Sequence, residues 1–192
     1  MKSYTVFGGV NGSGKTTMYK AIYYPFKKDE KRINTDEMLA SIGSWEDDNL
    51  QMKCAKEAVK LIRKYFSTGI SFNQETTLSG KSIVRNIKKA KELGFFVEMN
   101  FICTESPEIS KKRIRERVLK GGHGILDKAV ERRYVESLEN LKLVKDICDV
   151  INIYDNTNKF RLIAISEKGS LTWIGEELPN WYKINLKNVI TE

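Results

Sequence analysis

Residues 9 to 16 read GVNGSGKT, which completes the pattern G-x-x-x-x-G-K-[ST]. The apolar run Tyr4 to Phe7 precedes this stretch, and residues 17 to 22 follow it with a composition that suits a helix. When a strand, a glycine loop and a helix follow one another in this order, the backbone N–H groups of the loop face a bound phosphate chain. The positive N-terminal end of the helix faces the same phosphates. The alternative is an ordinary glycine-rich turn before a helix. The stretch therefore predicts binding of a nucleoside triphosphate.

The loop supplies specific contacts to such a ligand. Lys15 is expected to bridge the β- and γ-phosphates, and the hydroxyl of Thr16 is expected to hold Mg²⁺. ATP and Mg²⁺ are therefore the predicted cofactors, with Thr16 as the metal ligand. The residues predicted to contact the nucleotide are Gly9, Asn11, Gly12, Ser13, Gly14, Lys15, Thr16, Thr17 and, from a later helix, Arg113.

The composition indicates a globular chain rather than a disordered one. The chain has 192 residues, of which 41% are hydrophobic, so we expect one domain over residues 1–192. Its three cysteines have no C-x-x-C spacing, which argues against a disulfide framework or a zinc site. The phosphate loop begins at residue 9, and no apolar run approaches the length of a membrane span. We therefore expect a cytoplasmic protein that does not bind membranes.

The net charge of +8 narrows the choice of partners. Basic side chains are concentrated at Lys81 to Lys91 and at Lys111 to Lys120, both on predicted helices. A basic chain can bind nucleic acid, but it can equally attract a polyphosphate. Few aromatic residues lie among these basic residues, so stacking on single strands is poorly supported. Small phosphorylated ligands are favoured over nucleic acid.

Strand and helix patterns alternate along most of the chain. Helical spacing marks residues 47–66, 81–93, 107–120 and 127–147, and strand patterns mark 32–34, 70–73, 95–103 and 150–154. This order predicts a three-layer α/β fold of the P-loop, nucleotide-kinase-like type, with a mostly parallel five-stranded sheet. Runs at 160–166 and 171–174 flank a turn and predict a C-terminal β-hairpin extension. The core would cover about residues 3–155 and the extension about 156–192.

Asp36 is the candidate general base. Ligands of parallel sheets collect beyond the carboxyl ends of the strands, and Asp36 directly follows the strand pattern at 32–34. A carboxylate there can orient an acceptor hydroxyl and take its proton during phosphoryl transfer. The alternative is that Asp36 is the N-cap of a helix over residues 37–42.

Polar side chains also follow the next strand pattern. Glu75, Thr76 and Thr77 offer one carboxylate and two hydroxyls, so we predict that they contact the substrate, as does Asp36. Glu75 has an alternative role as a Walker-B-like acid that holds Mg²⁺ through water.

A basic segment near residue 120 is predicted to close over the nucleotide. Arg113 and Arg117 share a helix face, and Arg133 lies beyond the glycine pair at 121–122. Guanidinium groups on a hinged lid can neutralise the phosphoryl group in transfer and help to exclude water. Lys15, Asp36, Arg117 and Arg133 are therefore the predicted catalytic residues. A solvated basic face is the alternative for each arginine, and His123 is predicted to be a turn residue or lid contact.

These motifs together resemble the zeta toxin family of P-loop kinases. The resemblance rests on residues 8–17, 33–37, 75–80, 117–123 and 132–141, and its order and spacing cover about residues 3–155. It implies an ATP- and Mg²⁺-dependent kinase, with UDP-N-acetylglucosamine as the acceptor of the best-known members and an antitoxin protein as a candidate partner. By motif position, Lys15 and Thr16 would bind phosphate and Mg²⁺, Asp36 would activate the acceptor, and Arg117 and Arg133 would clamp the phosphates.

Three functions are consistent with the sequence. The first is a kinase that phosphorylates a hydroxyl of a small acceptor such as a UDP-sugar. The second is a polynucleotide or nucleoside kinase, and the third is a nucleotide-dependent switch that binds a macromolecular partner and hydrolyses ATP slowly. Where toxic members of the family place an arginine after the acid-and-threonine motif, this chain has Leu78-Ser79-Gly80.

Overall fold

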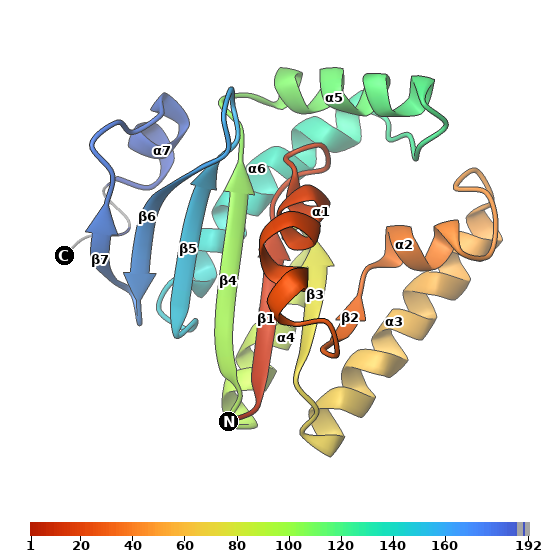
Figure 1. Ribbon diagram of the computed structural model, residues 1–192, viewed down its shortest axis with the longest axis horizontal. Coiled ribbons are helices and arrows are strands. Elements are labelled where there is room, and N and C mark those ends of the chain that lie inside the picture. The colour runs from red at the N-terminus through yellow and green to blue at the C-terminus, as the bar shows by residue number, and fades with distance from the viewer. Residues whose placement is uncertain (188–189, 191–192) are drawn as a thin grey trace.

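One sheet runs through the molecule (Figure 1) in a computed structural model that describes residues 1–187 and 190. Its strands are β1 (Ser3–Gly8), β2 (Lys31–Ile33), β3 (Phe72–Thr76), β4 (Phe96–Cys103), β5 (Val150–Asp155), β6 (Arg161–Glu167) and β7 (Ser170–Ile174). The spatial order is β2-β3-β1-β4-β5-β6-β7, in which the first five strands pair in parallel. Strands β6 and β7 pair antiparallel. The sheet thus has seven strands rather than five, because the predicted hairpin continues the same sheet.

The helices follow the predicted segments, with two exceptions. They are α1 (Lys15–Met18), η1 (Tyr19–Tyr23), η2 (Tyr24–Phe26), α2 (Thr35–Ala40), α3 (Asp48–Thr68), α4 (Lys81–Glu92), α5 (Pro107–Leu119), α6 (Asp127–Val144) and α7 (Asn180–Asn185). The helix predicted after the phosphate loop is only four residues long and continues as the π-helical η1 and the 3₁₀-helical η2. The short α7 has no counterpart among the predictions.

Local signals explain several of the helix ends. Asp47 caps α3, since its side chain accepts hydrogen bonds from the backbone N–H of Asn49 and of Leu50. Gly69 ends the same helix in the left-handed conformation. Helix α5 begins with Pro107, whose missing N–H costs nothing at the first helical position.

Helices cover the two faces of the sheet unequally. Figure 1 shows α1 in front of the sheet, with α4 and α6 behind it. The large cluster of buried apolar side chains includes Ile62 of α3, Ile87 of α4, Leu138 of α6 and Trp181 of α7. The cluster at the front consists of Phe7, Met18, Tyr19 and Ile102. The predicted three-layer arrangement is present, but its front layer is small.

The topology places ligand-binding groups near β1. The chain leaves β3 on one side of β1 and enters β4 on the other side, so the strand order reverses there. In open α/β sheets, the crevice at such a reversal is where ligands bind. Within residues 1–187 and 190, no helix is both long and apolar enough to cross a bilayer. The last residues of the predicted extension, 188–189 and 191–192, lie outside the described residues.

Candidate active site

The loop between β1 and α1 has a backbone that favours glycine at three points. Gly9, Gly12 and Gly14 have φ angles of 136°, 80° and 105°, in the region that side chains rarely adopt. A Cβ on Gly9 would collide with the carbonyl of Ile102, and one on Gly14 would collide with the side chain of Asn156. The glycines of the motif therefore let neighbouring segments approach the loop closely.

Lys15 is buried at the base of this loop, with 6% of its surface exposed. Its ammonium group donates to the carbonyl of Val10 at 2.9 Å, which uses one of its three donors. Burial lowers the pKa of Lys15, while the nearby charges of Glu75 and Asp36 act in the opposite direction. An anion beside Lys15 would favour its charged form further.

Two cavities meet above the loop. One, of about 440 Å³, is lined by the loop together with Arg113, Arg117 and Asn156. The other, of about 310 Å³, is lined by residues including Thr76, Thr77, His123 and Arg133. The residues that line both cavities are Asn11, Lys15, Asp36 and Glu75. The two cavities adjoin as the sites of a phosphate donor and a phosphate acceptor would. We call the first, above the loop, the phosphate or donor cavity and the second the acceptor cavity.

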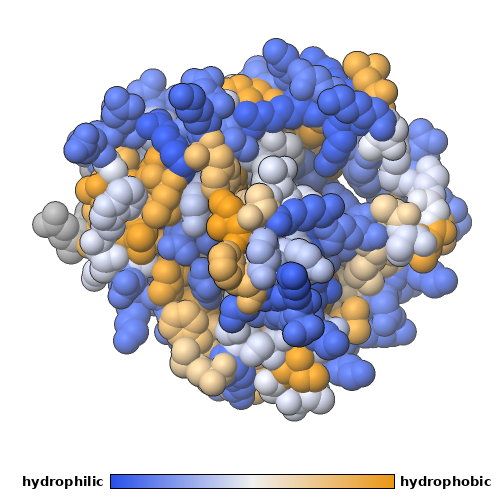
Figure 2. All heavy atoms as spheres, viewed as in Figure 1, coloured by the Kyte–Doolittle hydropathy of each residue, from blue (hydrophilic) through white to orange (hydrophobic). Residues whose placement is uncertain are grey.

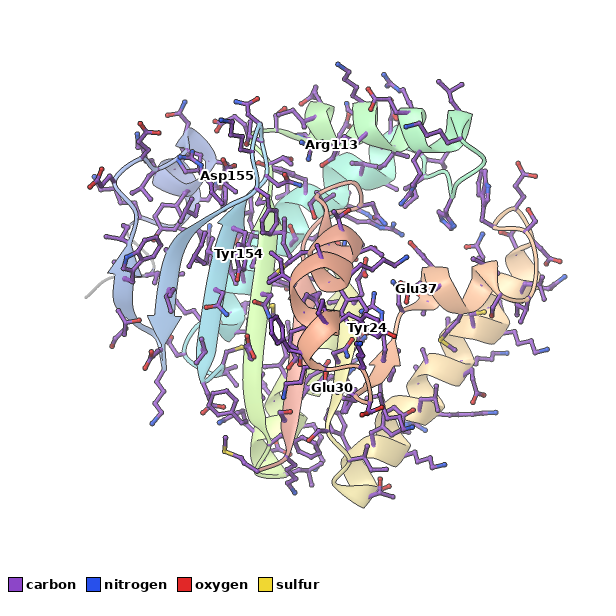
Figure 3. The ribbon with its side chains drawn as sticks, viewed as in Figure 1. Tyr24, Glu30, Glu37, Arg113, Tyr154 and Asp155 are labelled. Atoms are coloured by element: carbon purple, nitrogen blue, oxygen red, sulfur yellow. The ribbon has the colours of Figure 1, made fainter. Side chains whose placement is uncertain are left out.

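The surface shows the same site as a hollow. Figure 2 shows the molecule hollowed between α5 at the top and α2 at the right, with hydrophilic residues on most of the rim. Figure 3 marks the two sides by Arg113 on α5 and Glu37 on α2. The α5 side belongs to the segment that the sequence predicts to be a lid.

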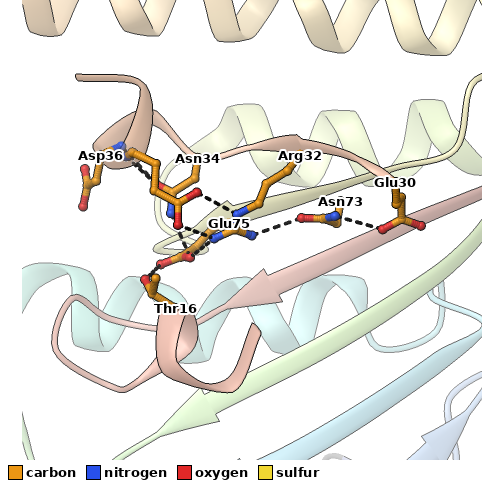
Figure 4. Close-up of polar contacts among 8 residues, drawn as sticks. Thr16, Glu30, Arg32, Asn34, Asp36, Asn73 and Glu75 are labelled. Carbon is orange, nitrogen blue, oxygen red and sulfur yellow. Dashed lines mark hydrogen bonds and ion pairs between the residues drawn. The ribbon is translucent and has the colours of Figure 1, made fainter. Parts of the chain in front are cut away.

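Glu75 is held by hydrogen bonds to both of its carboxylate oxygens (Figure 4). The hydroxyl of Thr16 donates to its Oε1 at 2.7 Å. Its Oε2 accepts from Arg32 Nη2 at 2.7 Å and from Asn34 Nδ2 at 2.9 Å. The side chains of Arg32 and Glu75 are only 12% and 10% exposed, so this ion pair is screened little by solvent. Glu75 thus joins the phosphate loop to β2.

Arg32 extends this network across the front of the sheet (Figure 4). Its Nε donates to Glu37 at 2.7 Å, and its Nη1 donates to Asn73 at 3.0 Å. Its guanidinium carbon lies 3.5 Å from the centre of the Tyr19 ring, which is a cation–π contact. Sequence reasoning missed Arg32, because its partners extend from Tyr19 to Glu75 in the chain and no motif includes it.

Asp36 does not cap a helix. The N-cap of α2 is Asn34, whose side chain accepts from the backbone N–H of Asp36 at 3.0 Å and of Glu37 at 3.4 Å. The capping alternative for Asp36 is therefore wrong, because Asp36 is the second residue of the helix. Its carboxylate lines both cavities instead.

The three predicted lid arginines contact only neutral oxygens of the protein. Arg113 Nη2 donates to the carbonyl of Thr157 at 3.0 Å, and Arg117 Nε donates to the carbonyl of His123 at 2.9 Å. Arg133 Nη1 donates to the side-chain oxygen of Asn11 at 2.9 Å.

Within the residues that the structure describes, none of these three arginines forms a salt bridge. Among the same residues, Arg113 Nη1 is buried and has no hydrogen-bond partner. The guanidinium groups of these arginines are therefore not held in ion pairs by the described residues.

Basic residues on the other faces of the same two helices behave differently. Lys111 pairs with Glu131 at 2.6 Å, Arg115 with Asp127 at 2.5 Å and Arg132 with Glu136 at 3.8 Å. The solvated-face alternative therefore describes the outer residues of α5 and α6. It does not describe Arg113, Arg117 and Arg133, which line the cavities.

His123 lies in the segment predicted to be a lid and contacts Trp45 and Arg117. Its ring lies 5.3 Å from the ring of Trp45, and its carbonyl accepts hydrogen bonds from Arg117. Burial lowers the pKa of His123, Asp36 opposes this effect, and the charges of Arg117 and Arg133 add to it. Burial in the site thus favours the neutral imidazole.

The chain turns sharply after β3, beside the acceptor cavity. Leu78 is fully buried at a φ angle of 55°, which is uncommon for a residue with a side chain. Its N–H donates to the hydroxyl of Thr76 at 3.1 Å. From α6, Asn140 Nδ2 donates to the carbonyls of Leu78 at 2.8 Å and Gly80 at 2.9 Å. Asn140 therefore fixes this turn. In the sequence, the only sign of Asn140 was that it lies within the motif at residues 132–141.

The fold and the glycine loop define the class of this protein, a P-loop kinase-like α/β protein. The family model for zeta toxin matches residues 2–168, and the chain belongs to that family. A protein from Haemophilus influenzae, described as uncharacterized, is 35% identical over 128 residues, which are 66% of this chain and 88% of that protein.

Solved structures show the same fold at low sequence identity. The AvrRxo1-ORF1:AvrRxo1-ORF2 complex with sulphate ions gives a TM-score of 0.73 at 14% identity, over 96% of this chain and 63% of that chain. The same complex with ATP gives a TM-score of 0.64 at 14% identity, with the same coverage. The PezAT chromosomal toxin–antitoxin system of Streptococcus pneumoniae gives 0.63 at 19% identity, over 99% of this chain and 78% of that chain. This chain therefore spans less than two thirds of the AvrRxo1 chain.

Proposed function

We propose that this protein is an ATP- and Mg²⁺-dependent kinase that transfers the γ-phosphoryl group to a hydroxyl of a small acceptor. The observation that carries the proposal is the cavity above the phosphate loop. Lys15, Arg113 and Arg117 line it, and no described carboxylate forms a salt bridge with any of the three. Several cations that lie beside a glycine loop and form no salt bridge suit a polyphosphate.

The residues present also fit a magnesium ion. A threonine hydroxyl has one proton and two lone pairs, and the proton of Thr16 is donated to Glu75. Its oxygen lone pairs therefore remain free for a cation, which is the role that the motif assigns to Thr16. Bound Mg²⁺ would neutralise charge on the triphosphate. In this proposal Glu75 orients Thr16, which supports the alternative that placed Glu75 on the metal side.

Asp36 is the better base of the two carboxylates in the cavities. Both oxygens of Glu75 are already engaged by hydrogen bonds from Thr16, Arg32 and Asn34, so neither is free to take a proton from an acceptor hydroxyl. The Asp36 carboxylate lies where the donor and acceptor cavities meet. It would orient the acceptor hydroxyl and accept its proton, while Thr76 and Thr77 line the acceptor cavity.

The lid arginines would respond to the bound nucleotide. A phosphate oxygen is a stronger partner for a guanidinium than the carbonyl of His123 or the amide of Asn11. Arg117 and Arg133 would therefore exchange these partners for phosphate oxygens and draw the segment 118–124 over the site. Exclusion of water would protect ATP from hydrolysis.

The family supports a nucleotide sugar, such as UDP-N-acetylglucosamine, as the first acceptor class to test. The AvrRxo1 complex with ATP and the PezAT toxin–antitoxin system support ATP as the donor and an antitoxin as a partner. A cytoplasmic location is part of the same proposal. A nucleoside or polynucleotide acceptor, and a switch that turns ATP over slowly, are the competing functions.

One comparison of ATP turnover separates these functions. ADP formation is measured with the protein alone, with a panel of nucleotide sugars, with nucleosides and with oligonucleotides, and the acceptor is analysed for a mass gain of one phosphoryl group. We expect phosphorylation of a small hydroxyl compound and little ADP without it. Phosphorylation of the oligonucleotides would overturn the small-acceptor assignment. Slow ADP formation that no acceptor accelerates would favour the switch.

A further inference from the structure

The C-terminal helix α7 lies beyond the residues that the family model matches, yet its Trp181 bonds to Asp155, and the next residue, Asn156, lines the phosphate cavity. We infer that Trp181 is a positioning residue for the nucleotide site. Through Asp155 it fixes residues 156–157, which in turn hold the phosphate loop and Arg113. This inference rests on the proposed function, because it assigns the cavity above the loop to ATP.

Asp155 is the centre of this connection. It is the last residue of β5 and is 3% exposed. Its Oδ1 accepts from Trp181 Nε1 at 3.0 Å and from Thr157 Oγ1 at 2.6 Å, and its Oδ2 accepts from Arg161 Nε at 3.2 Å. A buried carboxylate depends on such donors, so loss of one of them shifts its remaining partners or leaves a charge poorly compensated.

The residues after β5 connect Asp155 to both walls of the phosphate cavity. Asn156 Nδ2 donates to the carbonyl of Ser13 in the phosphate loop at 2.8 Å. The hydroxyl of Thr157 accepts a hydrogen bond from the backbone N–H of Glu105 at 2.9 Å. The backbone carbonyl of Thr157 accepts one from Arg113 at 3.0 Å. A single hydroxyl thus joins Asp155 to the segment that leads into α5.

Arg113 shows why the position of these residues matters. One nitrogen of its guanidinium bonds to the carbonyl of Thr157, and Nη1 is buried without a partner in the described chain. Arg113 lines the phosphate cavity, and Figure 3 shows Arg113 and Asp155 at the same end of the sheet. Because the guanidinium is planar and rigid, a shift of the Thr157 carbonyl changes the direction of its other donors.

Helix α7 itself supplies matched controls. The indole of Trp181 packs 6.3 Å from Phe101 and 6.1 Å from Tyr182, measured between ring centres. The hydroxyl of Tyr182 is buried without a hydrogen-bond partner among the described residues, so Tyr182→Phe removes a hydroxyl from α7 and breaks no such bond. Leu186→Ala removes buried apolar contact next to the same helix without touching Asp155.

The experiment measures the affinity of the full-length protein for a non-hydrolysable ATP analogue with Mg²⁺, by calorimetry. We expect Trp181→Phe, which keeps an aromatic ring but loses the N–H, to raise Kd about three- to tenfold. Thr157→Val, which keeps the shape of the side chain but loses the hydroxyl, should raise Kd by a similar factor. The double variant should show less than the product of the two effects, because both act through Asp155. Tyr182→Phe and Leu186→Ala should bind the analogue as the wild type does.

Thermal melting of each variant without nucleotide separates positioning from stability. Leu186→Ala should melt lower than Trp181→Phe and still bind normally. An unchanged Kd in both Trp181→Phe and Thr157→Val would overturn the inference. A weakened affinity in Leu186→Ala equal to that in Trp181→Phe would overturn it as well, since packing alone would then explain the effect. A wild-type protein that does not bind the analogue would refute the proposed function itself, and with it the site to be positioned.

Discussion

The two sides of the candidate site balance their charges in opposite ways. On the sheet side, the Glu75 carboxylate is bonded to Arg32, Asn34 and Thr16. On the lid side, Arg117 and Arg133 bond only to a carbonyl and an amide oxygen. The sheet side is complete within the protein, while the lid side carries charge for which the described protein residues supply no acid. The comparison indicates a rigid half that positions groups and a responsive half that needs an anion.

The largest effect is expected at the phosphate loop, between the two sides, from Lys15→Ala. This change removes a cation from the base of the phosphate loop, so phosphoryl transfer should be abolished and ATP binding weakened. The fold should persist, because Lys15 makes a single hydrogen bond, to Val10. Turnover, nucleotide affinity and thermal melting are measured on the same preparation. Wild-type ATP affinity and turnover in a folded Lys15→Ala protein would show that the loop is a structural turn.

Asp36→Asn tests the candidate general base, which lines both cavities. We expect transfer to fall by roughly 10²- to 10⁴-fold, the usual range for a positioned general base, with ATP affinity retained. Because Asn34 caps α2, the exchange leaves the cap in place. Single-turnover kinetics with a saturating acceptor make the measurement. Transfer at the normal rate would remove Asp36 from the chemistry.

Arg133→Gln tests the responsive half against a neighbour on the same helix. Loss of this guanidinium should lower kcat/KM by roughly 10²-fold, as for other groups that stabilise charge in the transition state. The control is Arg132→Gln, because Arg132 is exposed and pairs with Glu136 at 3.8 Å. It should change kcat/KM by less than about twofold. Equal effects of the two variants would indicate that Arg133, like Arg132, is only part of a solvated basic face.

Hydrogen exchange tests whether the lid responds to the nucleotide. A non-hydrolysable ATP analogue should slow exchange at residues 119–124, since Arg117 and Arg133 gain phosphate partners. The amides of α4 serve as the internal reference, because that helix packs on the far side of the sheet. Identical exchange at residues 119–124 with and without the analogue would contradict closure.

The smallest effect concerns pH. The pKa of His123 is lowered mainly by burial, so the unfolded chain binds a proton at a higher pH than the folded chain does. The neutral imidazole is fully compatible with the fold above the ordinary pKa of about 6.5, and stability is lost as pH falls through the lowered value. His123→Gln should therefore show a smaller drop in melting temperature between pH 7.5 and pH 5.5 than the wild type. An equal drop in both would assign the pH dependence to other groups.

Sequence patterns predicted the parallel sheet and most of the helices well, because these depend on local spacing and on glycine or proline signals. They placed the third strand at residues 70–73, whereas β3 runs from Phe72 to Thr76. Gln74 and Glu75 look like loop residues, but in the fold their side chains accept hydrogen bonds from Tyr4 and Arg32. Such partners are distant in sequence, so no local pattern could reveal them.

For the candidate site as well, sequence reasoning found the residues that belong to motifs and missed those that depend on tertiary contacts. The glycine loop, Asp36 and the lid arginines came from motifs, and the structure brings them around two adjoining cavities. Arg32 and Trp181 were missed, since each acts through a tertiary contact to an acid. Helix α7 was missed for a related reason, because burial of Trp181 and Tyr182, rather than helical periodicity, stabilises its six residues.

Helix α6 contacts two parts of the candidate site, the phosphate loop and the turn after β3. Arg133 bonds to the phosphate loop through Asn11, and Asn140 holds the strained turn at Leu78. The two residues are seven positions apart, which places them on the same face of a helix at a separation of about 10 Å along its axis. Any rigid rotation of α6 that moves Arg133 relative to the loop therefore also moves Asn140 and the turn at Leu78, which directly follows Thr76 and Thr77 of the acceptor cavity.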